Sequence, residues 1–332
     1  MANKKKKKKT LGDYFLTLIL LIAVGVFCFA GYNLFKIYME YKKGTDEYNH
    51  IAEIAVTDRE PDKQSDAGGD VQGDSAAGSG VKAPIEVDFG PLRSINTDVI
   101  GWLYVEAINS INYPVVKGKD NDEYLHATYE RNYNFAGTIF IDYENQADFS
   151  DCNTIIYGHN MKNGSMFGSL KKFSNDPNVY KTSPYIWMLT PAKNYRYEVF
   201  ASYVTAVNSD TYTLFKGPGS EFLEWIRKMR LNSAIETSAN EFDVTDKVIT
   251  LSTCTGDYST RYVVQARLTD VEIVDPVAAE QIDLEAIKRQ GFLTQESKDV
   301  QNDVPVQEQQ EVNETYNGDS EEFIEGSFMG LE

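Results

Sequence analysis

Residues 248–268 read VITLSTCTGDYSTRYVVQARL, and this stretch decides the expected fold. Its two ends, Val248–Thr253 and Tyr262–Leu268, are rich in β-branched residues, which favour strands. The polar residues between them are typical of a loop. We therefore expect Cys254 at the end of one strand and Arg261 at the start of the next. Such a thiol can be reactive beside a guanidinium, although a buried Cys254 and a surface Arg261 are the alternative, because free cysteine is often buried.

Strand signals recur through the preceding chain and indicate a mainly β domain. They lie at Gly101–Val105, Ile111–Val116, Gly137–Tyr143, Asn153–Tyr157, Tyr185–Thr190 and Tyr195–Val207. Together with the two strands around Cys254 they make seven or eight short strands, which favours a closed or nearly closed β-barrel over a βαβ fold.

Two helices are expected within this domain. Ser220–Leu231 has an apolar stripe at helical spacing and Ser220 as a plausible N-cap. It lies just before the cysteine strand. Gly164–Phe173 is expected to form a second, shorter helix.

The beginning of the chain predicts a membrane anchor. Six lysines, Lys4 to Lys9, precede the 22 uncharged residues Tyr14 to Phe35. A helix of that length rises about 33 Å and can cross a bilayer core of about 30 Å. The lysines place the N-terminus in the cytoplasm and the rest of the chain outside the cell. A cleaved signal peptide is the alternative, but the apolar run is long and no convincing cleavage site follows it.

Composition divides the 332 residues further. We expect a basic cytoplasmic N-terminus at 1–13, the anchor at 14–35, a stalk helix at 36–60, a flexible linker at 61–86 and a compact domain at 87–276. The remaining 277–332 form an acidic tail, which we expect to be disordered apart from a short helix near 281–292. From Glu280 onward there are 14 acidic and 3 basic residues, a large part of the net charge of −18. No basic patch lies beyond the N-terminus, so nucleic-acid binding is not indicated.

Few residues are available for chemistry. The three cysteines, Cys28, Cys152 and Cys254, are too sparse for a disulfide framework. His159 follows the strand Asn153–Tyr157, and two strand ends can meet at one mouth of a barrel. Cysteine would then supply the nucleophile, histidine the acid or base, and Arg261 a fixed positive charge.

Other arrangements of these residue types are less well supported. A zinc site is not expected, because no Cys or His pair has ligand spacing. His126 is expected to be structural or on the surface, and His50 belongs to the stalk helix.

Two motifs resemble a known family. The run TLSTC at Thr250–Cys254, followed by Arg261, resembles the signature of sortases, the membrane-anchored transpeptidases of Gram-positive bacteria. The run YGHNMKNGSMF at Tyr157–Phe167 resembles the histidine segment of class B sortases. The helix before the cysteine strand resembles a class B feature too. The resemblance covers about residues 37–275.

The resemblance implies an eight-stranded barrel with Cys254 as nucleophile, His159 as acid and base, and Arg261 at the oxyanion or the substrate. Ser252, Thr253 and Tyr157 match positions that line the substrate groove. The implied reaction cleaves a C-terminal sorting signal of a surface protein after Thr, forms a thioester, and transfers the protein to an amine of the peptidoglycan precursor. No metal or cofactor is implied. The long acidic tail departs from the family pattern.

Three alternatives remain open at this point: a sortase that polymerises pilins, a thiol hydrolase that uses water as the acceptor, and a wall-binding module without catalysis.

Overall fold

The computed structural model describes residues 11–59 and 80–302. The lysine block, most of the expected linker and the tail from residue 303 onward lie outside the described residues. The chain divides into two compact units, Met1–Ala279 and Glu280–Glu332. The first unit contains the barrel.

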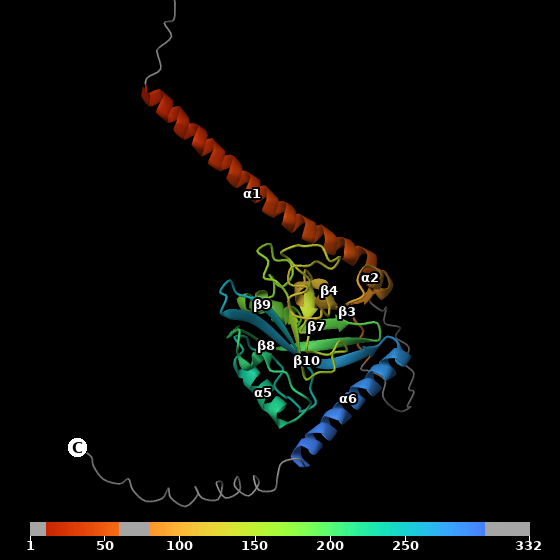
Figure 1. Ribbon diagram of the computed structural model, residues 1–332. Helices are drawn as coiled ribbons and strands as arrows, with labels where there is room; N and C mark the ends of the chain where they lie inside the picture. Colours follow the sequence, from red (N-terminus) through yellow and green to blue (C-terminus); the bar gives the residue numbers. More distant parts are fainter. Residues whose placement is uncertain (1–10, 60–79, 303–332) are drawn as a thin grey trace, which may run out of the picture. The chain divides into compact units, whose positions relative to one another are not determined.

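Eight strands close into a barrel in the order β10-β8-β7-β3-β4-β5-β6-β9. Figure 1 shows the barrel and labels several of its strands. Their bounds are β3 Val99–Val105, β4 Asn112–Val116, β5 Ile139–Ile141, β6 Asn153–Tyr157, β7 Tyr185–Leu189, β8 Lys193–Ala206, β9 Val248–Cys254 and β10 Thr260–Ile273. The expected eight-stranded barrel is confirmed, and each strand overlaps the segment predicted for it.

The strand β9 shows how the sequence forms the barrel core. Its first six residues are buried and only Cys254 is exposed. Ile249 and Leu251 belong to the main core, whereas Val248 belongs to a second cluster with the helix α5 (Ser220–Leu231). Because alternate side chains point to opposite faces, a strand covered on both faces reads as a continuous apolar and β-branched run.

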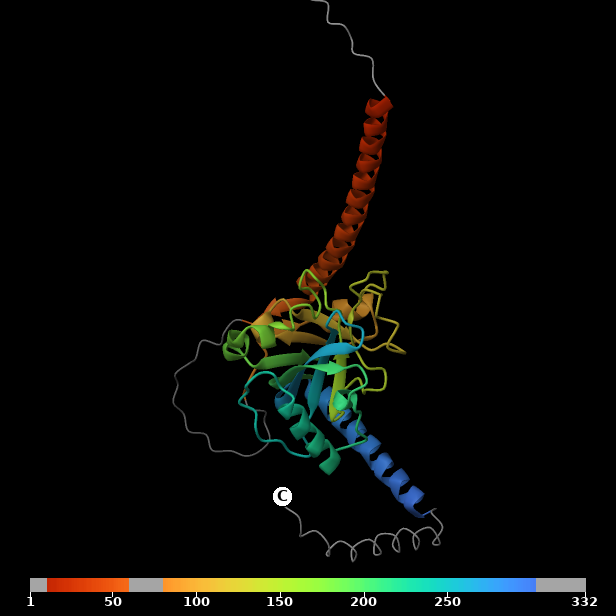
Figure 2. The same cartoon turned by 90° about the vertical axis from the view of Figure 1, so that its left-hand side faces the viewer.

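The helix α5 lies between β8 and β9 in the chain, as expected, and covers the outer face of the barrel wall (Figures 1 and 2). It buries Phe222, Trp225, Ile226 and Met229. The prediction of Ser220 as N-cap is wrong. Gly219 holds that position without a side-chain cap, and Ser220 is the first helical residue.

The helix predicted over Gly164–Phe173 is also wrong. The segment consists mainly of turns, and only Lys172–Asn175 are helical, as α3. Gly164 has φ +83° and Met166 has φ +51°, values that a right-handed helix excludes. Asn160 instead forms a β-bridge with Met166, which folds the segment back on itself.

The expected anchor and stalk form one continuous helix, α1 (Leu11–Ala55). Its first half is apolar and exposed, and it is long enough to cross a membrane. Its last turns pack on the barrel. Tyr48 donates to the Gly137 carbonyl at 2.5 Å and meets the Tyr113 ring edge-on at 5.4 Å. The stalk is therefore docked on the barrel.

A small sheet follows α1. The helix ends before the expected residue 60, and β1 (Val56–Asp58) pairs antiparallel with β2 (Ile85–Val87). The last residues of the expected linker are thus ordered, and Ile85 is buried. The remaining short elements are α2 (Phe89–Ile95), η1 (Glu106–Ile108), α4 (Pro177–Thr182) and η2 (Asp210–Tyr212).

The helix α6 (Pro276–Asn302) begins earlier and ends later than the short helix expected near 281–292. Its start has a recognisable signal. The Asp275 carboxylate accepts from the backbone of Val277 and Ala278, and Pro276 is the first helical residue. The helix therefore extends beyond residue 292, into the part of the tail that the sequence predicts to be disordered.

Gly137, just before β5, adopts a backbone conformation that only glycine accommodates easily, and a substitution there can test its importance for stability. It has φ +57°, and a Cβ there would lie 2.4 Å from the Leu125 carbonyl oxygen. We expect Gly137→Ala to lower the free energy of unfolding by about 2 kcal/mol, because both backbone strain and the clash oppose it. Thermal denaturation followed by circular dichroism measures the change. Gly217→Ala is the control, since nothing lies within 4 Å of its Cβ, and equal loss in both variants would contradict the explanation.

Candidate active site

The register of two neighbouring strands brings Cys254 and His159 to the same end of the barrel. β6 and β9 are parallel, and Tyr157 pairs with Ser252. His159 lies two residues beyond Tyr157, and Cys254 two residues beyond Ser252. Residues 95 apart in sequence are therefore brought together, His159 just beyond the end of β6 and Cys254 at the end of β9.

Arg261 reaches the same end from the third strand. β10 is antiparallel to β9, and Arg261 pairs directly with Cys254. Directly opposed residues project from the same face of a sheet. The hairpin predicted around Cys254 thus places the thiol and the guanidinium side by side.

The three residues line one cavity of about 190 Å³. Its other lining residues are Asn121, Leu125, Phe140, Tyr157, Gly158, Ser252 and Thr253. All six site residues expected from the sequence are therefore at this cavity. In the described part of the chain, no hydrogen bond joins the Cys254 thiol to the His159 ring; such contacts commonly tighten only when substrate binds.

The exposure of Cys254 suits a nucleophile. Its side chain is exposed, whereas the other β9 residues are buried. The backbone at this point is held by Asn160, whose amide donates to the Cys254 carbonyl oxygen at 2.7 Å. Asn160 directly follows His159, so one short segment contacts the nucleophile strand and also supplies the histidine.

The imidazole of His159 is partly buried and oriented. Its Nε2 lies 2.6 Å from the Leu125 carbonyl oxygen. A carbonyl only accepts, so Nε2 carries the proton in the neutral ring and Nδ1 is the basic nitrogen. Burial lowers the pKa of His159, the Leu125 carbonyl opposes this, and the neighbouring His126 lowers it further. The neutral form of the imidazole is therefore more favoured in His159 than in a histidine side chain in water.

The guanidinium of Arg261 is anchored through one nitrogen. Nη1 donates to the carbonyls of Tyr258 at 3.1 Å and Thr260 at 2.9 Å. No other hydrogen bond of this side chain occurs among the described residues. The other N–H groups are therefore free to meet an oxyanion or a substrate carbonyl.

Two of the three expected groove residues, Tyr157 and Ser252, are held by side-chain hydrogen bonds. Tyr157 donates to Asp142 at 2.9 Å, and burial together with that carboxylate raises its pKa. The hydroxyl of Ser252 lies 2.8 Å from that of Tyr212. Thr253 is buried and its hydroxyl is unpartnered among the described residues.

Several residues of the site had no sequence signal. Tyr212 belongs to a short 3-10 helix before α5. Burial raises the pKa of its hydroxyl, although the hydrogen bond to Ser252 and the charge of Arg261 oppose the shift. Asn121, Leu125 and Phe140 come from β5 and the segment before it. His126 is on the surface, as expected, but its ring stacks on His159. Only Asn160 could have been suspected, because it adjoins His159.

Metal and disulfide chemistry find no support in the described residues. They contain no cluster of three His, Cys, Asp or Glu side chains that could hold a metal ion. Cys28, Cys152 and Cys254 are all free, and Cys152 is buried.

Comparison with known proteins decides the family. The family model for the sortase domain matches residues 103–269, from the last residues of β3 through β9 and most of β10. The curated Sortase B of Listeria monocytogenes is 33% identical over 251 residues, 75% of this chain and 94% of the relative. The chain belongs to the sortase family. The Sortase B of Staphylococcus aureus is 26% identical over 77% of this chain and 98% of the relative.

Solved structures agree with the sequence comparison. Sortase B from Bacillus anthracis in complex with AAEK1 superimposes with a TM-score of 0.56 at 31% identity, covering 70% of this chain and 99% of that chain. The expected class B resemblance is confirmed. This sortase is an enzyme, a cysteine transpeptidase, and its apolar N-terminal helix is a candidate membrane anchor.

Proposed function

We propose that this sortase cleaves a C-terminal sorting signal after Thr and transfers the protein to an amine of cell-wall peptidoglycan. The observation that carries the proposal is the register of β6, β9 and β10. It sets an exposed thiol, a partly buried imidazole and a guanidinium around one cavity. Those three groups match the needs of acyl transfer.

In the first half of the reaction, the Cys254 sulfur bonds to the carbonyl carbon after its proton passes to His159. Arg261 stabilises the negative charge on the carbonyl oxygen. The C–N bond then breaks, and the departing amine takes the proton from His159. In the second half, the acceptor amine attacks the thioester carbon and gives a proton to His159. The C–S bond then breaks, and the departing Cys254 thiolate takes that proton back from His159. Ser252, Thr253 and Tyr157 would contact the sorting signal along the cavity wall.

We further propose that the N-terminus is cytoplasmic and the catalytic domain extracellular. The lysine block before the apolar half of α1 supports this orientation. It would place the cavity on the side of the membrane where surface proteins and wall precursors meet.

A panel of sorting-signal peptides tests the reaction. We expect mass spectrometry to show an acyl group on Cys254 with one or a few peptides, and a ligated product when an amine such as a short glycine peptide is added. Absence of both acyl-enzyme and product across the panel would refute the proposal.

The acceptor distinguishes the remaining possibilities. Product release at the same rate with and without amine would identify a hydrolase. Ligation to a lysine of a pilin subunit in preference to wall amines would identify a pilin polymerase. Retention of the cellular phenotype by Cys254→Ala would identify a binding module.

A further inference from the structure

The segment between β4 and β5, residues 117–138, has no regular secondary structure but adjoins the site. It supplies Leu125 and His126, which both contact His159. A loop that orients a reacting group must itself be held in place, because small displacements of such a group reduce turnover strongly.

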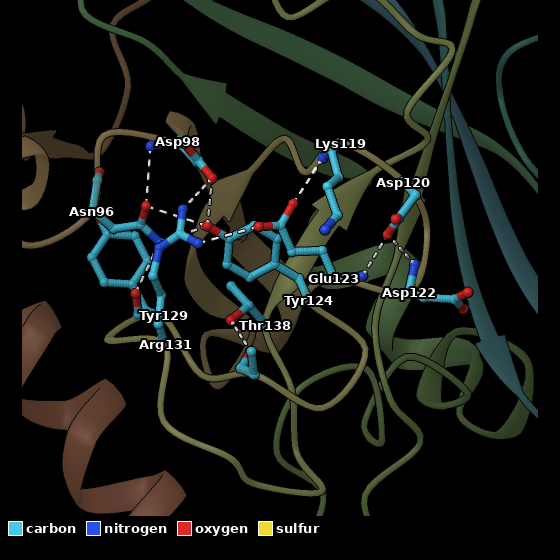
Figure 3. Close-up of polar contacts among 11 residues, drawn as sticks. Asn96, Asp98, Lys119, Asp120, Asp122, Glu123, Tyr124, Tyr129, Arg131 and Thr138 are labelled. Atoms are coloured by element: carbon cyan, nitrogen blue, oxygen red, sulfur yellow. Dashed lines mark hydrogen bonds and ion pairs between the residues drawn. The ribbon is translucent and has the colours of Figure 1, made fainter.

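A polar network at the barrel surface holds this segment, as Figure 3 shows. Tyr124, the residue before Leu125, donates to Asp98 at 2.8 Å. Arg131 donates to the same carboxylate at 2.5 Å and to Glu123 at 3.2 Å. The two halves of the segment are therefore joined to each other and, through Asp98, to the start of β3.

The buried part of this network carries most of the rigidity. The Asn96 amide donates to the Tyr124 hydroxyl and to the Tyr129 carbonyl, both at 2.9 Å, and these three residues are almost fully buried. Arg131 is about half exposed, so its ion pairs contribute little. Thr138 closes the segment, since its backbone donates to the Tyr124 carbonyl at 3.1 Å.

The result is a fixed surface against His159. The carbonyl of Leu125 lies 2.6 Å from Nε2. The ring of His126 stacks on that of His159 with centroids 5.4 Å apart and planes 18° apart. The carbonyl fixes one ring nitrogen, and the stacked ring restricts rotation of the imidazole plane.

We propose that His126 is a positioning residue for His159, which with the Leu125 carbonyl holds the His159 ring in one orientation and leaves Nδ1 as the nitrogen that exchanges protons with the reactants. The proposal rests on the proposed role of His159 in proton transfer. His126 itself acts through His159 and does not touch the cavity, since it is not among the residues that line it.

Histidine at position 126 also adds a charge effect that phenylalanine would lack. A protonated His126 disfavours protonation of His159, and it lowers the pKa of that ring. The other titratable or charged side chains that line the cavity with His159 are Tyr157, Cys254 and Arg261. Substitution of His126 leaves all three in place.

The full chain in detergent micelles or nanodiscs allows a direct test. It contains only three histidines, His50, His126 and His159, so isotope-labelled imidazoles can be assigned by substitution. In the wild type we expect NMR to show neutral His159 as the Nε2–H tautomer. In His126→Phe the ring still stacks but carries no charge. We expect the His159 titration midpoint, and the matching limb of the pH–rate profile, to move to higher pH, with most of the turnover retained.

His126→Ala removes the ring itself. We expect kcat to fall about tenfold with little change in KM, because loosening the proton-transfer group loses part of its 10²- to 10⁴-fold contribution. His50→Gln is the matched control, since His50 is exposed on α1 away from the cavity, and it should change neither readout.

An Nδ1–H tautomer in the wild type would overturn the proposal. So would an unchanged His159 titration and turnover in both His126 variants. If His126→Ala does not fold, the titration of His159 in His126→Phe and the tautomer of His159 in the wild type still test the proposal. A failure of the proposed function can be told apart from a failure of this proposal. In the first case the wild type forms no acyl-enzyme, whereas the NMR measurements on His159 can still be interpreted.

Discussion

Replacing Cys254 with alanine is expected to abolish transpeptidation, with a loss of at least about a thousandfold in kcat, because no other group at the cavity can form the thioester. The fold should survive. The side chain is exposed at the last position of β9, while the six residues before it are buried. Peptide turnover and circular dichroism of the same sample measure both effects.

Two control variants sharpen this result. Cys28→Ala changes an exposed cysteine in the apolar half of α1 and should leave turnover unchanged. Cys152→Ala changes a buried cysteine next to α5, and should reduce stability rather than the turnover of folded enzyme. Residual acyl-enzyme in Cys254→Ala, or gross unfolding of that variant, would contradict the role assigned to Cys254.

Replacing Arg261 with lysine is expected to reduce kcat about a hundred- to thousandfold, the usual cost of losing one oxyanion donor. Arg261 satisfies the Tyr258 and Thr260 carbonyls through Nη1 alone. A lysine ammonium is a compact point charge and cannot make these contacts while also presenting the remaining planar N–H donors. Steady-state kinetics with a sorting-signal peptide selected from the panel measure the change.

Arg267→Lys is a matched control on the same strand. Arg267 lies on β10 outside the cavity, where it donates to the Glu241 carbonyl and packs over Phe242. We expect it to alter stability more than kcat. Near-normal turnover in Arg261→Lys, or an equal loss of kcat in both variants, would remove Arg261 from the proposed mechanism.

The sequence predicted the strands well because their signals are local. β9 is covered on both faces, so nearly every position is apolar or β-branched, and its ends are marked by polar residues. The helix α5 was found from its apolar stripe. The prediction failed where a local sequence pattern was compatible with either a helix or a series of turns. Residues 164–173 were predicted as a helix, but Gly164 and Met166 adopt positive φ where the bridge between Asn160 and Met166 folds the segment back.

The sequence suggested the residues of the candidate site, but it could not show how they are arranged in space. A cysteine at a strand end is compatible with burial or with catalysis, and the histidine 95 residues earlier made the second reading better supported. Asn160, Tyr212 and His126 carry no comparable signal, since amide, phenol and imidazole groups on loops are common. Their importance follows only from contacts with Cys254, Ser252 and His159.

The sequence by itself determined which segments become strands, which helix precedes β9, which run is apolar enough to cross a membrane, and which cysteine ends a strand. Periodicity and composition fix these features because each depends on neighbours in the chain. Only the tertiary structure decided that β6 lies parallel to β9 in a register that pairs Tyr157 with Ser252. Strand order and register depend on how the whole barrel closes, and that closure sets His159, Cys254 and Arg261 around one cavity.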